Sequence, residues 1–336
     1  MRFGLALPQY DYSLPGIDTI GWSHVRDWAV RAEEMGFDSI WLSDHLFLDI
    51  SKYGGPDEPH GAMECWTTIA ALTSATSRVR LGTLVLCNDL RPPSLVAKMA
   101  ATVDLLSGGR LEIGMGAGWY EPDYRAAGIE FRPAGARIER LAEAVQIVRG
   151  MLQSEKFSFA GKHYEIADAY NLPKAVQRPN PPVWVGGKGD RLVKVAARYA
   201  DGFNSVWAWT PAAFGERIAL LDKCAIEAGR DPSQIRKSVG LYTLGGDDLR
   251  EIESRFENYQ RVSLGASKDM SLQQWRADKL CGTAEEILER VSSFEALGVE
   301  EVILGFGLLP FQIADEGAVE WFANEIFPLT ASRQGA

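Results

Sequence analysis

The sequence predicts a single (β/α)8 barrel of the α/β class, a TIM barrel with insertions, formed by residues 1–336. Eight short apolar segments alternate with eight amphipathic segments, and no shift in composition marks a second domain. The apolar segments are rich in Val, Ile and Leu with little alternation, which is typical of strands buried on both faces of a parallel sheet. In such a barrel the ligand site lies at the carboxyl ends of the strands.

The first half of the chain alternates regularly between the two kinds of segment. Gly36 and the pair Gly108-Gly109 follow helical patterns, where a residue without a Cβ readily ends a helix. The expected strands cover 2–7, 39–43, 80–86 and 110–115, and the expected helices cover 23–35, 64–76 and 92–106.

The second half continues the alternation after a long helix. A hairpin that pairs 157–159 with 164–165 around Gly161 follows this helix, and Thr283 with Glu286 forms a capping-box pattern for a later one. The expected helices cover 134–152, 191–199, 211–229, 283–297 and 317–326, and the expected strands cover 183–186, 202–206, 237–244 and 301–306.

Three segments interrupt the repeat and are expected to be insertions, at about 46–63, 153–180 and 245–282. The last of these is polar and charged, with only weak helical spacing at Leu249, Ile252, Phe256 and Tyr259. We expect it to be a partly mobile excursion from the barrel.

Composition limits the partners. The net charge of −10 and the pI near 5.1 argue against nucleic acid or an acidic membrane surface, so a small molecule is the expected ligand. The four cysteines show no CxxC spacing, which predicts neither a zinc cluster nor a disulfide framework and favours a reduced, cytoplasmic setting. No apolar run is long enough for a membrane span, and the one at 3–7 is too short for a secretory signal.

The residues that follow the second and third strands are candidates for chemistry. His45 is the only histidine directly after a strand, and imidazole exchanges protons near neutral pH, so a catalytic or ligand-contacting role is expected. Asp44 either contacts a ligand or caps the following turn. Cys87 and Asn88 follow the third strand, where the asparagine either stabilises a turn or contacts a ligand amide. No second histidine stands at metal-ligand spacing, so no metal site is predicted.

Glycine-rich turns follow the fourth and fifth strands. The turn of Gly116, Ala117, Gly118 and Trp119 is expected to open another helix, and it is either a tight turn or a cradle for a flat or charged ligand. The run Gly186-Gly187-Lys188-Gly189 precedes a helix and is either a phosphate site at a helix start or a turn with solvated charges. Three tryptophans are either walls of an aromatic pocket or the edge of the core, namely Trp119, Trp207 and Trp209.

These motifs resemble a known family. The segments GFDSIWLSDH at 36–45, the whole of 76–129, RPNPPVWVGGKGD at 178–190 and AARYADGFN at 196–204 are similar, in the same order, to the bacterial luciferase-like monooxygenase superfamily. They resemble most the branch that uses the deazaflavin coenzyme F420. The resemblance implies a bacterial luciferase-like barrel, a homodimer, and hydride transfer between coenzyme F420 and a small organic substrate.

The resemblance also implies roles for particular positions. His45 would stand near the reacting face of the deazaflavin, and the end of the third strand around Cys87 and Asn88 would lie against the ring, where relatives often have a bulge with a cis peptide. The glycine turn at 116–119 would border the cofactor side chain and 185–189 would carry its phosphate. The full set of implied cofactor-binding residues is Asp44, Cys87, Asn88, Gly116, Ala117, Gly118, Trp119, Tyr124, Val185, Gly186, Gly187, Lys188 and Gly189.

Other functions remain open from the sequence. A two-component monooxygenase that uses reduced FMN and O2 would need the same barrel, histidine and glycine turn. A non-catalytic cofactor-binding protein is an alternative of another class, and a barrel hydrolase lacks a visible nucleophile or metal constellation. In relatives that oxidise a sugar phosphate, a Trp and a Glu stand where this chain has Asp49 and Trp119, which argues against such a substrate.

Overall fold

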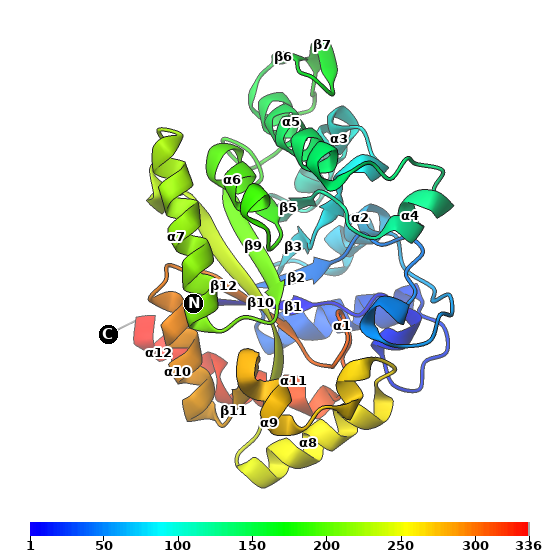
Figure 1. Ribbon diagram of the computed structural model, residues 1–336, viewed down its shortest axis with the longest axis vertical. Coiled ribbons are helices and arrows are strands. Elements are labelled where there is room, and N and C mark those ends of the chain that lie inside the picture. The colour runs from blue at the N-terminus through cyan, green and yellow to red at the C-terminus, as the bar shows by residue number, and fades with distance from the viewer. Residues whose placement is uncertain (335–336) are drawn as a thin grey trace.

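The computed structural model describes residues 1–334 and contains a closed barrel of parallel strands surrounded by helices (Figure 1). The last barrel strand pairs with the first, so the barrel itself is closed. The predicted (β/α)8 barrel is therefore confirmed. The barrel strands, in spatial order, are β1 (Arg2–Ala6), β2 (Ser39–Leu42), β3 (Arg80–Thr83), β5 (Leu111–Gly116), β8 (Val183–Gly186), β9 (Gly202–Trp207), β10 (Arg236–Gly245) and β12 (Glu301–Gly305).

Helices cover the outside of the barrel. Glu64 caps the second one by accepting the backbone N–H groups of Trp66 and Thr67, and the predicted capping box of Thr283 and Glu286 begins another. No helix among residues 1–334 is long and apolar enough to cross a membrane. The main helices are α1 (Trp22–Met35), α2 (Cys65–Ala75), α3 (Pro93–Leu106), α5 (Ala134–Gln153), α6 (Asp190–Tyr199), α7 (Pro211–Glu227), α10 (Ala284–Glu295) and α11 (Glu316–Glu325).

Two tryptophans fill the amino-terminal half of the barrel interior. The rings of Trp41 and Trp184 are buried edge to face with centroids 6.5 Å apart. Gly82 and Gly202 make room for them, because a Cβ at either glycine would lie 2.2 Å from an indole carbon. The two indole rings occupy this end of the barrel interior. The cavity described below therefore lies toward the carboxyl ends of the strands.

The third strand is broken, whereas the sequence predicted one strand over 80–86. β3 ends at Thr83, whose hydroxyl bonds both the N–H and the carbonyl of Gly114. These side-chain bonds replace the ladder, and pairing with β5 resumes only in β4 (Leu86–Cys87). The peptide between Leu84 and Val85 is cis, as is the one between Val206 and Trp207.

The insertions are more regular than expected. The predicted hairpin is confirmed and longer, with β6 (Lys156–Ala160) and β7 (Glu165–Tyr170) projecting at the top of Figure 1. The stretch 245–282 forms α8 (Leu249–Val262), α9 (Leu272–Trp275) and β11 (Leu280–Gly282), which pairs with the end of β10. Ile252, Phe256 and Tyr259 form the buried side of α8, so their spacing did mark a helix. The partial mobility expected of the segment 245–282 stays a prediction.

Two further helices complete the chain. α4 (Glu121–Ala126) begins directly after the glycine turn, and α12 (Phe327–Gln334) follows α11 at the end of the described residues. The sequence predicted that a helix begins after that turn but did not predict α12.

Candidate active site

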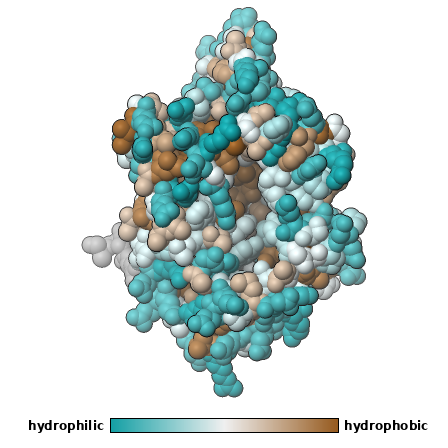
Figure 2. Space-filling view, in the orientation of Figure 1, coloured by the Kyte–Doolittle hydropathy of each residue, from teal (hydrophilic) through white to brown (hydrophobic). Residues whose placement is uncertain are grey.

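A cavity of about 720 Å³ opens at the carboxyl ends of the barrel strands. Figure 2 shows this face hollowed near its middle, with hydrophobic residues in the hollow. Eleven of the predicted site residues line the cavity, which are Asp44, His45, Cys87, Gly116, Ala117, Gly118, Trp119, Tyr124, Gly186, Gly187 and Lys188.

His45 is held by a carboxylate that lies 78 residues further along the chain. Its Nδ1 is 2.6 Å from Oδ2 of Asp123, a buried residue in the first turn of α4. The rings of Trp119 and Tyr120 pack edge to face against the imidazole, with centroids 5.4 and 5.6 Å away. His45 therefore has a fixed orientation at the edge of the cavity.

Asp123 was not predicted from the sequence. Its Oδ1 accepts the backbone N–H groups of Leu46 (3.1 Å) and Phe47 (2.8 Å), so this side chain anchors the start of the 46–63 insertion. The only local signal was an acidic residue in the first turn of a helix, which usually indicates no more than a favourable interaction with the helix dipole.

Tyr120, whose ring packs on His45, is itself held by Asp49. The Tyr120 hydroxyl bonds the Asp49 carboxylate and accepts the Asp49 N–H. Burial and this carboxylate raise the pKa of Tyr120 to about 12, so the hydroxyl stays protonated at neutral pH.

Asp44 lines the cavity, but its carboxylate is bonded to other residues of the protein. Its carboxylate receives two hydrogen bonds from Arg91, at 2.7 and 2.9 Å, and a third from the Cys87 N–H at 2.9 Å. Burial raises the Asp44 pKa, against the opposing effect of Arg91. Both carboxylate oxygens are engaged in these bonds, so the side chain ties the end of β2 to the turn after β4. The cofactor contact expected of this residue stays a prediction.

Three other predicted contacts lie outside the cavity lining. Asn88 is buried and donates to the Tyr164 hydroxyl, 3.2 Å away beneath the hairpin. Val185 is a fully buried core residue of β8, and Gly189 is the residue before α6. The Gly187 N–H, expected to hold a phosphate, instead bonds the carbonyl of Asn204 at 3.1 Å.

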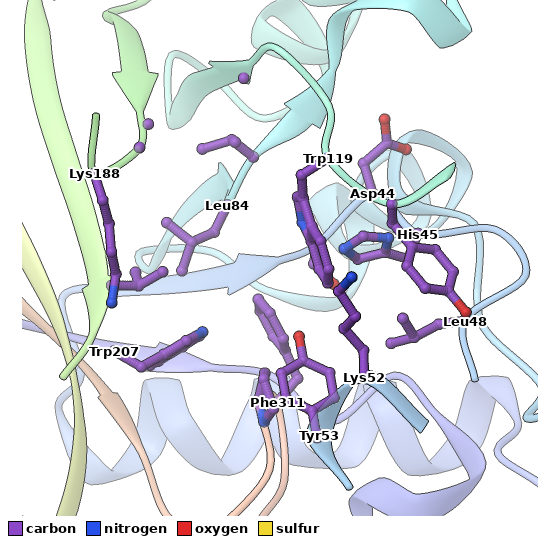
Figure 3. Close-up of a pocket in the computed structure, with 18 of the residues that line it drawn as sticks. Asp44, His45, Leu48, Lys52, Tyr53, Leu84, Trp119, Lys188, Trp207 and Phe311 are labelled. Carbon is purple, nitrogen blue, oxygen red and sulfur yellow. The ribbon is translucent and has the colours of Figure 1, made fainter. Parts of the chain in front are cut away.

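Aromatic side chains form the walls. Figure 3 shows Trp119 and His45 on one side of the cavity, opposite Trp207 and Lys188. Trp207 stacks on Tyr242 with centroids 5.3 Å apart, whereas Trp209 lies outside the lining and packs on Phe214. Two of the three predicted tryptophans, Trp119 and Trp207, thus line the same cavity.

Cys87 and Tyr124 lie together behind the glycine turn. The thiol is 3.2 Å from the tyrosine hydroxyl, and burial raises its pKa to about 11. The thiol is therefore not a thiolate at neutral pH and is a poor nucleophile. A Cβ on Gly118 would lie 2.0 Å from that hydroxyl, so the turn packs closely here.

Lysines supply the positive charge of the cavity. Lys188 and Lys279 line the side near β8 and β11, and Lys52 lies on the opposite side near Trp119. Burial, with a smaller contribution from Lys279, lowers the pKa of Lys188. Within residues 1–334 no group of three or more His, Cys, Asp or Glu could hold a metal ion.

A family model described as luciferase-like monooxygenase matches residues 1–301. The F420-dependent glucose-6-phosphate dehydrogenase of Amycolatopsis mediterranei (strain U-32) is 36% identical over 180 residues, or 53% of this chain and 51% of that relative. The aligned region thus spans about half the length of that relative.

Two relatives match over more of their length. The F420-dependent hydroxymycolic acid dehydrogenase of Mycobacterium tuberculosis (strain ATCC 25618 / H37Rv) is 28% identical, covering 89% of this chain and 82% of that one. The FMNH(2)-dependent dimethylsulfone monooxygenase of Pseudomonas putida is 27% identical, covering 90% and 86%. A solved F420-dependent secondary alcohol dehydrogenase, in complex with an F420-acetone adduct, shares the fold, with a TM-score of 0.77, 22% identity and coverage of 97% and 98%.

Proposed function

The chain belongs to the luciferase-like monooxygenase family of enzymes, and from this premise we propose that it transfers a hydride between coenzyme F420 and a small organic substrate. One observation carries the proposal. A cavity of about 720 Å³ with aromatic side chains in its lining lies at the strand ends, and beside it stands a histidine whose second ring nitrogen has no partner among residues 1–334. Hydride transfer asks the protein mainly for orientation and a dry site, with few polar side chains.

The residues fit a deazaflavin. The space between Trp119 and Trp207 suits a flat ring system, with Leu84 among the apolar contacts. Lys188 supplies charge that would hold the anionic side chain of the cofactor, and Lys279, which is also paired with Asp278, lies on the same side. The backbone of the Gly187 turn has less to offer a phosphate than the sequence suggested, so we assign this role to the lysines.

The deazaflavin would supply the hydride chemistry, because it exchanges two electrons at carbon and reacts poorly with oxygen. The protein supplies the rest. His45 presents Nε2 to the cavity, where it can take or give the accompanying proton. The residues of the 46–63 and 245–282 insertions that line the cavity, including Tyr53 and Trp275, keep water from the reacting atoms.

The F420-dependent relatives support this cofactor, since one is 36% identical and another aligns over 89% of this chain. We do not propose a sugar phosphate as substrate. Asp49 is bonded to Tyr120 and Trp119 packs against His45, so the positions that differ from sugar-phosphate dehydrogenases carry other contacts here.

A monooxygenase that uses reduced FMN is the second candidate. The Pseudomonas putida relative that aligns over 90% of this chain favours it, and the same walls would accept a flavin ring. The two cofactors differ at the central ring position, which is carbon in the deazaflavin and nitrogen in FMN, and only reduced FMN activates oxygen readily.

The test is a parallel titration of the purified protein with F420 and FMN, following quenching of tryptophan fluorescence. Tighter binding of F420, with no oxygen uptake beyond a protein-free control, supports the proposal. Tighter binding of FMN, with oxygen uptake in the presence of a flavin reductase, would move the protein to the monooxygenases. Binding of neither would overturn both.

A further inference from the structure

Six tyrosines line the cavity, and their hydroxyl groups fall into two sets. Four hydroxyls bond another residue of the protein, and they belong to Tyr10, Tyr12, Tyr120 and Tyr124. The other two, on Tyr53 and Tyr242, have no hydrogen-bond partner in the part of the chain that the structure describes. Neither oxygen is shielded from solvent, so both are open to a molecule in the cavity.

Tyr242 is fixed by its neighbours. The residue is 9% exposed, its ring stacks on Trp207 with centroids 5.3 Å apart, and Lys279 Nζ lies 5.9 Å from its centroid. Tyr242 belongs to β10, which stands across the barrel from β3. Leu84, which we assigned to the apolar contacts of the cofactor ring, follows β3. A substrate that lies on the cofactor would therefore have its far side against Tyr242.

Tyr53 reaches the same region from the 46–63 insertion. It ends the short helix Ser51–Tyr53, and its N–H bonds the Ile50 carbonyl at 2.9 Å. Its ring packs against the apolar cluster that contains Phe311, and Figure 3 shows its hydroxyl pointing into the cavity. The Tyr53 phenol is close enough to add to the raised pKa of Tyr242, so the two hydroxyls act on one part of the cavity.

Both hydroxyls are neutral hydrogen-bond donors. Burial raises the pKa of Tyr53 to about 12 and the pKa of Tyr242 well above its ordinary value, so both keep their proton at neutral pH. A carbonyl oxygen has two lone pairs and can accept from both at once. An alcohol would bring a proton of its own among apolar neighbours such as Phe311. A carboxylate would bring a full charge, whereas Lys279 is already paired with Asp278.

We propose that Tyr53 and Tyr242 form a subsite that binds a carbonyl oxygen of the substrate, as in a ketone, ester or amide, through two donated hydrogen bonds. This subsite deepens the proposed function and rests on it, because the substrate is assigned to the space beside the cofactor. Met270 and Phe311, which line the same cavity, provide apolar contacts for the hydrocarbon part of such a molecule.

The decisive variants are Tyr53→Phe and Tyr242→Phe. Each removes one hydroxyl and keeps the ring that packs in the cavity wall. The matched control is Tyr12→Phe, since Tyr12 lines the same cavity but donates to the Pro310 carbonyl at 3.2 Å. Its replacement removes a tyrosine hydroxyl that is already paired.

Probes of similar shape separate the ligand classes. Acetophenone carries the carbonyl, isopropenylbenzene has CH2 in place of the oxygen, methylphenylcarbinol has a hydroxyl there, and benzoate has a carboxylate. Dissociation constants are measured by ligand-observed NMR titration. Tyr53→Phe and Tyr242→Phe should each weaken acetophenone binding by about 3–10-fold, and leave isopropenylbenzene within about twofold. Tyr12→Phe should change neither. Comparison of variants with one probe cancels the different hydration of the probes.

Two kinds of result contradict this expectation. Equal weakening of acetophenone and isopropenylbenzene would mean lost packing rather than a lost hydrogen bond, and no weakening of either would mean that the hydroxyls are not used; both results overturn the subsite. A larger loss with methylphenylcarbinol or benzoate than with acetophenone overturns the carbonyl class.

The infrared carbonyl stretch of bound acetophenone is a second readout. Hydrogen bonds to the oxygen weaken the C=O bond, so the stretch should lie at lower frequency in the wild type than in hexane. Tyr53→Phe and Tyr242→Phe should each return it part of the way, whereas Tyr12→Phe should not. A bound stretch equal to that in hexane overturns the subsite without any variant.

Titration with F420 separates this subsite from the cofactor, whose ring also carries carbonyl oxygens. F420 affinity should stay within about threefold in Tyr53→Phe and Tyr242→Phe. A fall in F420 affinity without a change in acetophenone binding would assign the hydroxyls to the cofactor and overturn the substrate assignment. A wild type that binds acetophenone through these hydroxyls but does not bind F420 overturns the proposed function, while the carbonyl subsite stands.

Discussion

Replacing Arg91 by Met should destabilise the protein strongly, because it leaves a buried carboxylate without its cation. The Asp44 side chain is 0% exposed and the Arg91 side chain 13%, and the guanidinium bonds both Asp44 oxygens. Methionine keeps much of the volume of the arginine stem and removes the charge. The Cys87 N–H would remain as the main partner of Asp44.

The magnitude follows from this geometry. Removing one partner of a buried ion pair costs about 3–5 kcal/mol, because the remaining charge stays desolvated. At about 2 °C of thermal midpoint per kcal/mol for a chain of this size, the expected loss is roughly 6–10 °C.

The loss should depend on pH with a known sign. Burial already raises the Asp44 pKa, and Arg91 is the main group that lowers it, so the variant moves this pKa further above its unfolded value. A carboxyl whose folded pKa is raised gains stability as the pH falls, since the folded state binds the proton first. The deficit of the variant should therefore be larger at pH 8 than at pH 5.

The assay is thermal unfolding by circular dichroism at both pH values. Arg26→Met is the control, since Arg26 pairs with Asp27 on the surface, where the two side chains are 45% and 59% exposed. We expect it to change stability by less than about 1 kcal/mol. An Arg91→Met variant within about 2 °C of the wild type at pH 8, or with a larger deficit at pH 5, would refute the reasoning.

Three further variants test other parts of the structure. His45→Ala should keep F420 affinity within about tenfold, or ~1.4 kcal/mol, and lower kcat by at least ~100-fold, measured by titration and steady-state kinetics; unchanged kcat would exclude a proton role. Gly187→Val should weaken F420 binding, because φ is +150° and a Cβ would lie 2.3 Å from Leu192; unchanged affinity would place the cofactor elsewhere. Glu33→Gln should cost about 1–2 kcal/mol at pH 7. Despite partial burial, backbone N–H groups at 77–79 lower the Glu33 pKa to about 2, so this cost should shrink in thermal melts as the pH falls below 4.5 toward 2; a constant cost would contradict it.

The glycine variant has a matched control in the same turn. A Cβ on Gly189 would meet no atom within 4 Å, and its φ is −78°, so Gly189→Val should leave F420 affinity within about threefold. Equal weakening in both variants would indicate that the turn tolerates no branched side chain, whatever it binds.

Local sequence was sufficient to predict the barrel fold and most of the residues at its mouth. Apolar periodicity and helix-end signals depend on near neighbours, which is why the strand order, the hairpin and the capping box of Thr283 could be predicted. Strand ends in a parallel barrel converge on one edge, so residues such as His45, Trp119 and Lys188 were expected together and do line one cavity.

The tertiary structure decided what each of those side chains contacts. Asp44 and His45 are adjacent in sequence, yet one is bonded to Arg91 in the core and the other lines the cavity with a ring nitrogen that no described residue bonds. The sequence around Asp123 did not identify its role, because that role arises only when the folded barrel brings α4 against the segment after β2. The sequence by itself determined most of the residues that reach the mouth of the barrel, because the periodicity of its apolar residues locates the strand ends. Their hydrogen-bond partners depend on distances between remote segments, which only the folded barrel sets.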